Sequence, residues 1–173
     1  TSMQRSLQPI EPNEPDSRVN TVCLVFKTHL DLGFTDSACG VRRRYLDEFF
    51  PRAIETSVRL DRTPDRFVWT TGSYILGEAL NQADSRRRRV VDRAVRAGRL
   101  AWHAMPFTLH TELADPGLLA FGMDLSRELD RRYGVVTRAG KCSDVPGHTI
   151  GAVPVFAAAG LRFLHIGVNA ASP

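Results

Sequence analysis

Short apolar runs alternate with longer amphipathic runs along most of this 173-residue chain. Each apolar run except the last is followed by a stretch in which apolar residues recur at helical spacing. Strands that alternate with helices in this way pair in parallel through right-handed crossovers. The sequence therefore predicts an α/β protein of parallel β/α repeats with about five strands, at residues 21–27, 67–70, 100–105, 139–143 and 163–167.

The first run, residues 21–27, is apolar almost throughout, which is typical of a central strand covered on both faces. A helix is predicted over about 41–60, and Pro51 is expected to break or kink it. The best-defined helix begins after the Asp115-Pro116 cap and ends at Gly134. Its apolar face is expected to carry Leu118, Phe121, Leu125 and Leu129, and other helices are predicted at 74–80, 86–97 and 150–159.

Composition indicates one globular domain, because 43% of the residues are hydrophobic and 24% are charged. A disordered polyelectrolyte, a collagen-like repeat and a mucin-like stalk all need a more skewed composition. Residues 4–17 contain three prolines among polar residues and few large aliphatic ones. We expect a flexible tail at 1–17 and the folded domain at 18–173.

The charge and cysteine content exclude several classes of partner. A net charge of +4 is too small an excess to indicate nucleic acid, and the Arg86–Arg89 run is expected to be a solvated helix start. No apolar run approaches the roughly 18 residues of a membrane span. Three cysteines without a C-x-x-C pair support neither a disulfide framework nor a zinc ribbon, which favours a reducing compartment and slightly favours the cytoplasm.

Polar residues follow four of the predicted strands, at the ends where parallel sheets place their sites. His29 and Asp31 are two residues apart after the first strand, so their side chains leave the backbone on one side. Asp144, after the fourth strand, is a candidate third ligand for zinc. The structural alternative is that His29 and Asp31 cap the next helix and pair with each other. His148, four residues after Asp144, is predicted to hold a carboxylate in place, with direct ligation of the metal as the alternative.

The other histidines have structural explanations. His103 and His165 lie within predicted strands, where a hydrogen-bonded core histidine is the favoured interpretation. His110 and Glu112 lie in a loop after the third strand. Such a loop is able to reach the strand ends, and simple solvation explains its polar residues equally well.

Two segments resemble the opening motifs of glycoside hydrolase family 38, the zinc-dependent α-mannosidases. They are Lys27-Thr28-His29-Leu30-Asp31-Leu32-Gly33-Phe34 and Ser143-Asp144-Val145-Pro146-Gly147-His148, and the resemblance extends over about residues 21–168. It implies a seven-stranded β/α barrel in which His29, Asp31 and Asp144 bind zinc. It also implies that Asp144 is the nucleophile of a retaining reaction on a carbohydrate, with Phe34 stacking near the sugar.

The departures from the family pattern concern both motifs. The family usually has a histidine where Lys27 stands and a tryptophan where Phe34 stands, and the proline before His148 is moved by one position. The family's fourth zinc ligand and its general acid lie far downstream of these motifs. We therefore expect an N-terminal fragment of a larger enzyme, with an incomplete barrel, little activity alone, and an open sheet edge that favours association with a second copy.

Two other functions remain open at this point. A metal-dependent carbohydrate or amide deacetylase uses similar His and Asp sites but activates a water instead of a carboxylate. A sugar-binding barrel remnant without catalysis is the other alternative, which the substitutions at Lys27 and Phe34 favour. Retention of His29, Asp31 and Asp144 together speaks against such a remnant.

Overall fold

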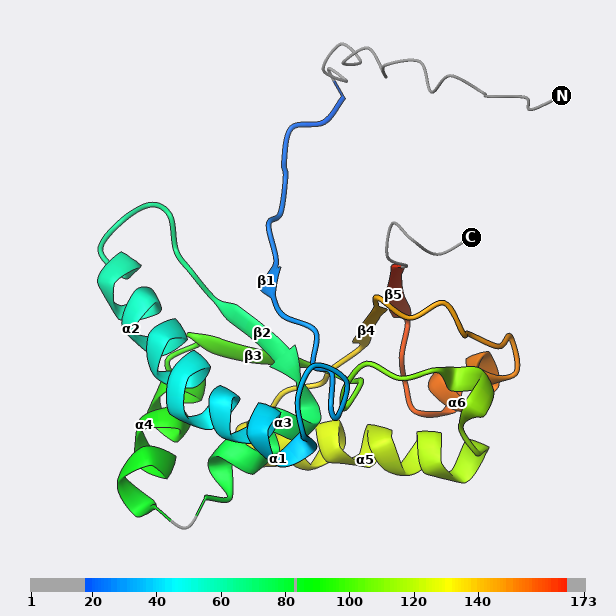
Figure 1. Ribbon diagram of the computed structural model, residues 1–173. Helices are drawn as coiled ribbons and strands as arrows, with labels where there is room; N and C mark the ends of the chain where they lie inside the picture. Colours follow the sequence, from blue (N-terminus) through cyan, green and yellow to red (C-terminus); the bar gives the residue numbers. More distant parts are fainter. Residues whose placement is uncertain (1–17, 83, 168–173) are drawn as a thin grey trace, which may run out of the picture.

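The computed structural model describes residues 18–82 and 84–167, so the predicted tail at 1–17 lies outside the described residues. All strand pairs among these residues are parallel. One sheet has the order β1-β2-β3 and a second contains β4 and β5 (Figure 1). The strands are β1 (Phe26–Lys27), β2 (Trp69–Gly72), β3 (Leu100–His103), β4 (Ala139–Ser143) and β5 (Phe163–Gly167).

The two sheets meet between β3 and β4. There the backbone N–H of Ala104 donates to the carbonyl of Ala139 over 2.9 Å. The predicted α/β class with parallel strands is thus confirmed. The strands of the described residues do not close into a barrel.

The first helical region is continuous through Pro51. It consists of α1 (Ala38–Arg44), a π-helical stretch η1 (Tyr45–Phe49) and α2 (Phe50–Leu60). Pro51 is the second residue of α2, in the turn that follows the π-helical residues. A proline at this point has no N–H to donate, and the widened turn before it accommodates the missing bond. The helix predicted at 41–60 is confirmed, but Pro51 does not end it.

Local capping signals position the remaining helices. In α5 (Pro116–Tyr133), the Asp115 side chain accepts from the N–H groups of Gly117 at 2.7 Å and Leu118 at 3.3 Å, and Gly134 follows with φ 70°. Such a left-handed residue is the common end of a helix. The others are α3 (Ser73–Leu80), α4 (Ser85–Arg96), the 3₁₀ turn η2 (Thr111–Leu113) and α6 (Ala152–Ala158).

The apolar face expected for α5 is only partly correct. Leu129 is buried, but Leu118 and Phe121 are mostly exposed. The face of α5 that packs inward is turned by about one residue relative to the expected face. It includes small residues and a methionine beside two leucines. It consists of Leu119, Gly122, Met123, Ser126 and Leu129.

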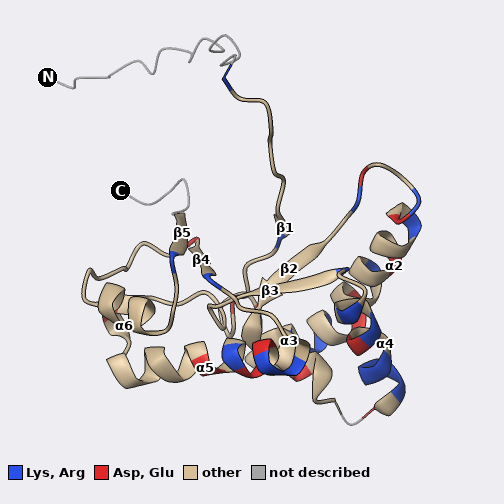
Figure 2. Cartoon of the chain, turned by 180° about the vertical axis from the view of Figure 1, so that it is seen from behind, with Lys and Arg blue, Asp and Glu red and all other residues tan. Residues whose placement is uncertain are grey.

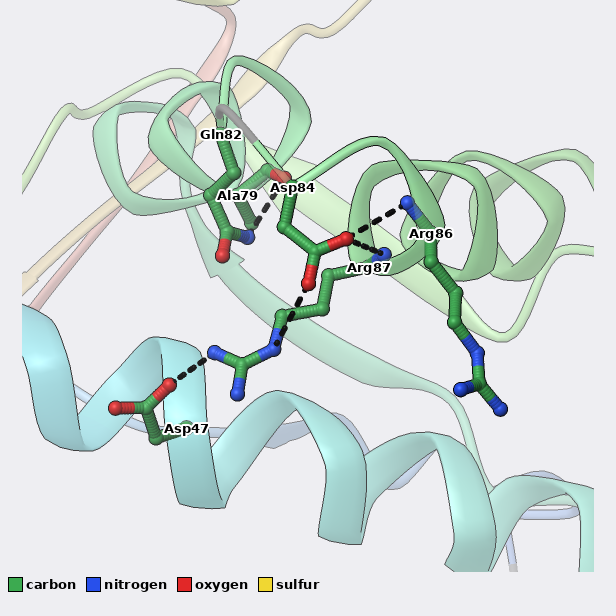
Figure 3. A network of polar contacts seen from close by, with 6 residues as sticks. All are labelled: Asp47, Ala79, Gln82, Asp84, Arg86 and Arg87. Carbon is green, nitrogen blue, oxygen red and sulfur yellow. Dashed lines mark hydrogen bonds and ion pairs between the residues drawn. The ribbon is translucent and has the colours of Figure 1, made fainter.

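The arginine run begins α4, as predicted, and carries a polar network (Figure 3). Asp84 caps the helix by accepting from the N–H groups of Arg86 at 2.8 Å and Arg87 at 3.2 Å, and these bonds hold the pKa of Asp84 below its usual value. The Arg87 guanidinium also pairs with Asp47 of η1. Basic residues are frequent along α4 (Figure 2), and Arg87 connects this helix to the first helical region through Asp47.

Two hydrophobic clusters form the core. The larger lies between the β1-β2-β3 sheet and the helices α1 to α4, and centres on Trp69, Phe50 and the fully buried Ile75 and Leu76. The smaller lies under β4, where Met105, Met123, Cys142 and Phe156 pack together. Among the described residues, no helix is both long and apolar enough to cross a membrane.

The prediction of a central first strand at 21–27 is wrong for the described structure. Only Phe26–Lys27 pairs as a strand, and Val22 and Leu24 are about three-quarters exposed, at 74% and 76%. Figure 1 shows the chain before β1 running away from the body of the molecule. An apolar run indicates that a segment is able to be buried, but what covers it depends on other segments. In the described chain, burial begins at Leu30.

Candidate metal centre

His29 and Asp31 lie on either side of a buried anchor. Leu30, between them, is 3% exposed and packs into the larger core cluster. The alternation of an extended chain directs its two neighbours away from that core. The Tyr45 hydroxyl donates to the His29 carbonyl over 2.8 Å, and burial raises the pKa of Tyr45, which keeps this hydroxyl protonated. The first helical region thus fixes the backbone that carries both side chains.

Asp144 follows β4 directly and has an unusual backbone conformation. Its φ is 69°, and it is the only non-glycine residue with positive φ among the described residues. Aspartate tolerates this left-handed region better than most residues do, but the conformation still costs free energy. The Asp144 N–H donates to the carbonyl of Gly167 at the end of β5, which holds the turn in place. This turn directs the carboxylate toward the end of β1.

The three side chains meet at ligand distances. His29 Nε2 lies 3.2 Å from Asp31 Oδ2 and 3.4 Å from Asp144 Oδ2. All three ligand atoms lie within 4.8 Å of one another. Two ligands of one tetrahedral ion with bonds of about 2.1 Å lie about 3.4 Å apart. The two distances from His29 are close to this value, so the three side chains are arranged as one imidazole and two carboxylate ligands of a metal ion would be.

Hydrogen bonding alone satisfies this arrangement poorly. A neutral imidazole has at most one hydrogen on Nε2, whereas two carboxylates approach that nitrogen. Two neighbouring carboxylates also repel each other unless a cation lies near them. A metal ion satisfies both carboxylates and the nitrogen lone pair at once, and the partial exposure of all three side chains leaves room for further ligands.

A cavity of about 260 Å³ opens beside the cluster. Its walls include Asp31 and Asp144, together with Phe34, which is 84% exposed. This volume is slightly below the roughly 300 Å³ at which small-molecule pockets begin. The cavity also includes Leu32, Thr108, His110 and Val145.

The two histidines of the neighbouring loops lie differently from each other. His110, which sequence reasoning left undecided, lines the cavity, whereas His148 Nδ1 lies 3.4 Å from the Thr111 hydroxyl. The cluster found among the described residues does not include His148. Burial, and then the nearby His110, lowers the pKa of His148. The predicted role of His148 in holding a carboxylate stays a prediction.

His103 and Lys141 are buried polar residues that the strand-end pattern did not select. His103 is 9% exposed and its Nδ1 has no hydrogen-bond partner among the described residues. The prediction of a hydrogen-bonded core histidine at position 103 is therefore wrong for the Nδ1 atom of His103. Lys141, inside β4, is 7% exposed. The sequence contained one signal for this residue. A lysine inside a predicted strand is unusual, because lysine is rarely fully buried.

No protein-family model matches this chain, and a search of curated proteins finds no similar sequence.

Proposed function

We propose that this chain carries the metal centre and the nucleophile of a zinc-dependent retaining glycoside hydrolase that acts on α-mannoside-like glycans. The observation that carries the proposal is the convergence of His29, Asp31 and Asp144 within 4.8 Å, from the ends of two strands in different sheets. The order and spacing of these residues resemble the motifs of family 38. We take the two parallel sheets as part of the seven-stranded barrel of such an enzyme.

His29, Asp31 and Asp144 would hold the zinc. When bound, the ion would supply Lewis-acid contacts to hydroxyl groups of the sugar. Asp144 Oδ2 faces His29, which leaves the other carboxylate oxygen available to attack the anomeric carbon. That attack forms a glycosyl ester and breaks the bond to the leaving oxygen, which takes a proton from the general acid that the family resemblance places far downstream of Asp144. Water would then hydrolyse the glycosyl ester, which releases the sugar and restores the Asp144 carboxylate. The left-handed turn at Asp144 keeps this carboxylate oriented during both steps.

Phe34 and the cavity fit a sugar-binding role. An aromatic ring that is 84% exposed and borders a cavity is available to stack on the apolar face of a pyranose. Thr108 and His110 line the same cavity and offer hydrogen bonds. This combination of one aromatic platform and a few polar groups is typical of sites that orient a small polar ligand.

Zinc content and affinity test the metal centre on this chain. We expect about one zinc per chain, and loss of specific binding in the His29→Ala/Asp31→Ala double variant. An Asp65→Ala variant, in an exposed loop of the same chain, is the matched control and should bind zinc like the parent. Equal zinc binding by the double variant, or no zinc in the parent, would contradict the assignment.

Turnover of an α-mannoside tests the role of Asp144. We expect Asp144→Asn to keep the fold and to abolish release of mannose from an activated α-mannoside. A slowly hydrolysed mannoside should label the parent covalently at Asp144 and leave the variant unlabelled. Normal turnover by Asp144→Asn would refute the proposal. Release of acetate from an acetylated sugar without a covalent adduct would instead indicate the deacetylase.

A further inference from the structure

A second cavity, of about 670 Å³, lies near the starts of β3 and β4. Its walls include the first residue of each strand, Leu100 and Ala139, and the last turns of α4 and α5. The metal cluster instead follows the carboxyl ends of β1 and β4. Cavities that bind small molecules have volumes of about 300–1,000 Å³. The size of this cavity therefore suits a small ligand.

Two aromatic side chains form a fixed part of the cavity wall. The rings of Trp102 and Tyr133 lie with their centroids 5.7 Å apart, and both residues line the cavity. Trp102 Nε1 donates to Asp130 over 3.0 Å, and the Tyr133 hydroxyl donates to Asp92 over 2.8 Å. The polar atoms of both rings are thus already bonded, so their apolar surfaces remain for a ligand. A flat apolar group packs well against such surfaces.

The segment between α5 and β4 adds exposed apolar side chains to the same wall. Val135 is 46% exposed and Val136 is 74% exposed, and both line the cavity. Removal of apolar surface from water is favourable, at about 25 cal/mol per Å². A ligand that covers these valines together with the two rings would gain this contribution.

The charged groups of the cavity favour an anionic ligand. Its described lining residues include two arginines, Arg96 and Arg138, and no carboxylate. Arg96 pairs with Asp92 at 2.9 Å, whereas the exposed Arg138 forms no ion pair within the described ranges. Asp130 accepts from the N–H and the hydroxyl of Thr137 at 2.8 and 2.7 Å, in addition to its bond from the indole. Arg138 therefore remains available to an anion at the cavity.

We propose that this cavity binds a small molecule that has a flat aromatic body and one anionic group. The aromatic body lies against Trp102 and Tyr133, and the anion pairs with the Arg138 guanidinium. Arginine suits this contact, because its planar fork of N–H donors pairs with two oxygens of a carboxylate or sulfonate. The candidate metal centre takes no part in this binding, so the proposal is independent of the proposed function.

The groove between α2 and α4 has different charges. Its volume is about 590 Å³, but its lining includes the carboxylates of Asp47, Glu55 and Asp84. Figure 3 shows Arg87 between Asp47 and Asp84, with which it forms ion pairs. Carboxylates at this position repel an anionic ligand. This groove therefore serves as the comparison site in the experiment.

Anilinonaphthalene sulfonate is a suitable probe, because it combines a flat aromatic body with a single sulfonate. It is titrated into chain labelled with ¹⁵N in the tryptophan indoles, which gives two indole signals. We expect the Trp102 signal, identified with a Trp102→Phe variant, to shift and to saturate with a Kd of about 0.1 mM or tighter. The signal of Trp69, which is 5% exposed in the larger core cluster, should stay in place. An unchanged Trp102 signal, or equal shifts of both signals, would overturn the proposal.

The anion contact is tested at Arg138. Phenylnaphthylamine has the same aromatic body without the sulfonate and should bind about fivefold more weakly. Arg138→Met should weaken binding of the sulfonate probe by about the same factor and leave binding of the neutral compound unchanged. Arg62→Met removes an equal charge from an exposed turn outside the cavity and is the control. Equal affinity of the two variants for the sulfonate probe would refute the proposal.

A carboxylate placed in each cavity locates the bound probe. Val136→Asp should weaken binding of the sulfonate probe by about tenfold or more, because it adds a negative charge and removes apolar surface. Val90→Asp makes the same change in the groove between α2 and α4 and should have no effect. Weaker binding in Val90→Asp, with normal binding in Val136→Asp, would place the probe in that groove and overturn the proposal.

The titration is carried out in the presence of a chelator, which separates it from the test of the metal centre. The His29→Ala/Asp31→Ala variant should bind the probe like the parent, and loss of probe binding in that variant would contradict the cavity proposal. Probe binding at Trp102 without zinc binding would support the cavity and refute the metal centre. Zinc binding without probe binding would support the metal centre and refute the cavity.

Discussion

Acidification should destabilise this protein through His103 before its carboxylates contribute. Burial, reinforced by Lys141 and then Lys27, lowers the pKa of His103 from 6.5 to about 4. Below about pH 6.5 the unfolded chain takes up a proton that the folded chain refuses, so the free energy of unfolding falls until about pH 4. The interval from 6.5 to about 4, at about 1.4 kcal/mol per pH unit, corresponds to a loss of about 3 kcal/mol.

Urea unfolding between about pH 7 and pH 4 measures this loss, and a His103→Phe variant isolates it. The variant should lose about 3 kcal/mol less than the parent over that interval. The pKa of His148 is also lowered, so a His148→Phe background removes the second histidine contribution. Asp84 and Asp92 have pKa values below 3.8, so their stabilising contributions are lost only at still lower pH. Parallel stability curves for parent and His103→Phe would refute the reasoning.

Two further predictions concern packing and are checked by thermal or urea unfolding. Gly72→Ala should destabilise the protein by about 1–3 kcal/mol, because the added Cβ would overlap the Pro106 carbonyl oxygen. Gly77→Ala is its control, with nothing within 4 Å of the added Cβ, and should be neutral or stabilising. Ser126→Ala should stabilise the protein by about 1 kcal/mol, because the buried Ser126 hydroxyl has no partner among the described residues. A loss of stability in Ser126→Ala would show that this hydroxyl is satisfied.

Those parts of the fold that depend on local signals were predictable from the sequence. The bounds of β4 and β5 match the predicted strands at 139–143 and 163–167. The Asp115 cap and the left-handed Gly134 fix both ends of α5 as expected, because a cap requires only neighbouring residues.

Features that depend on distant segments were not predictable in the same way. The apolar run at 21–27 indicated a buried strand, yet the side chains of Val22 and Leu24 are exposed. In α5, helical spacing selected Leu118 and Phe121, whereas the neighbouring elements contact a face turned by about one residue. Periodicity identifies apolar residues, but the contacting element decides which of them it covers.

The candidate site shows the same division. The rule that polar groups gather at the ends of parallel strands correctly predicted that His29, Asp31 and Asp144 lie together. The burial of Lys141 was missed because the strand-end rule selects residues that follow a strand, whereas Lys141 lies inside β4.

The charges of the site constrain the ligand more than its shape does. Carboxylates of Asp31 and Asp144 gather at the strand ends, whereas Lys27 and Lys141 lie further back along the same strands. The buried Lys141 ammonium donates to the Ser143 hydroxyl and is attracted by Asp144, so part of its charge is compensated without any ligand. A metal ion bound by Asp31 and Asp144 would add two positive charges close to Lys141, so the charge of a ligand is the property that should most affect binding.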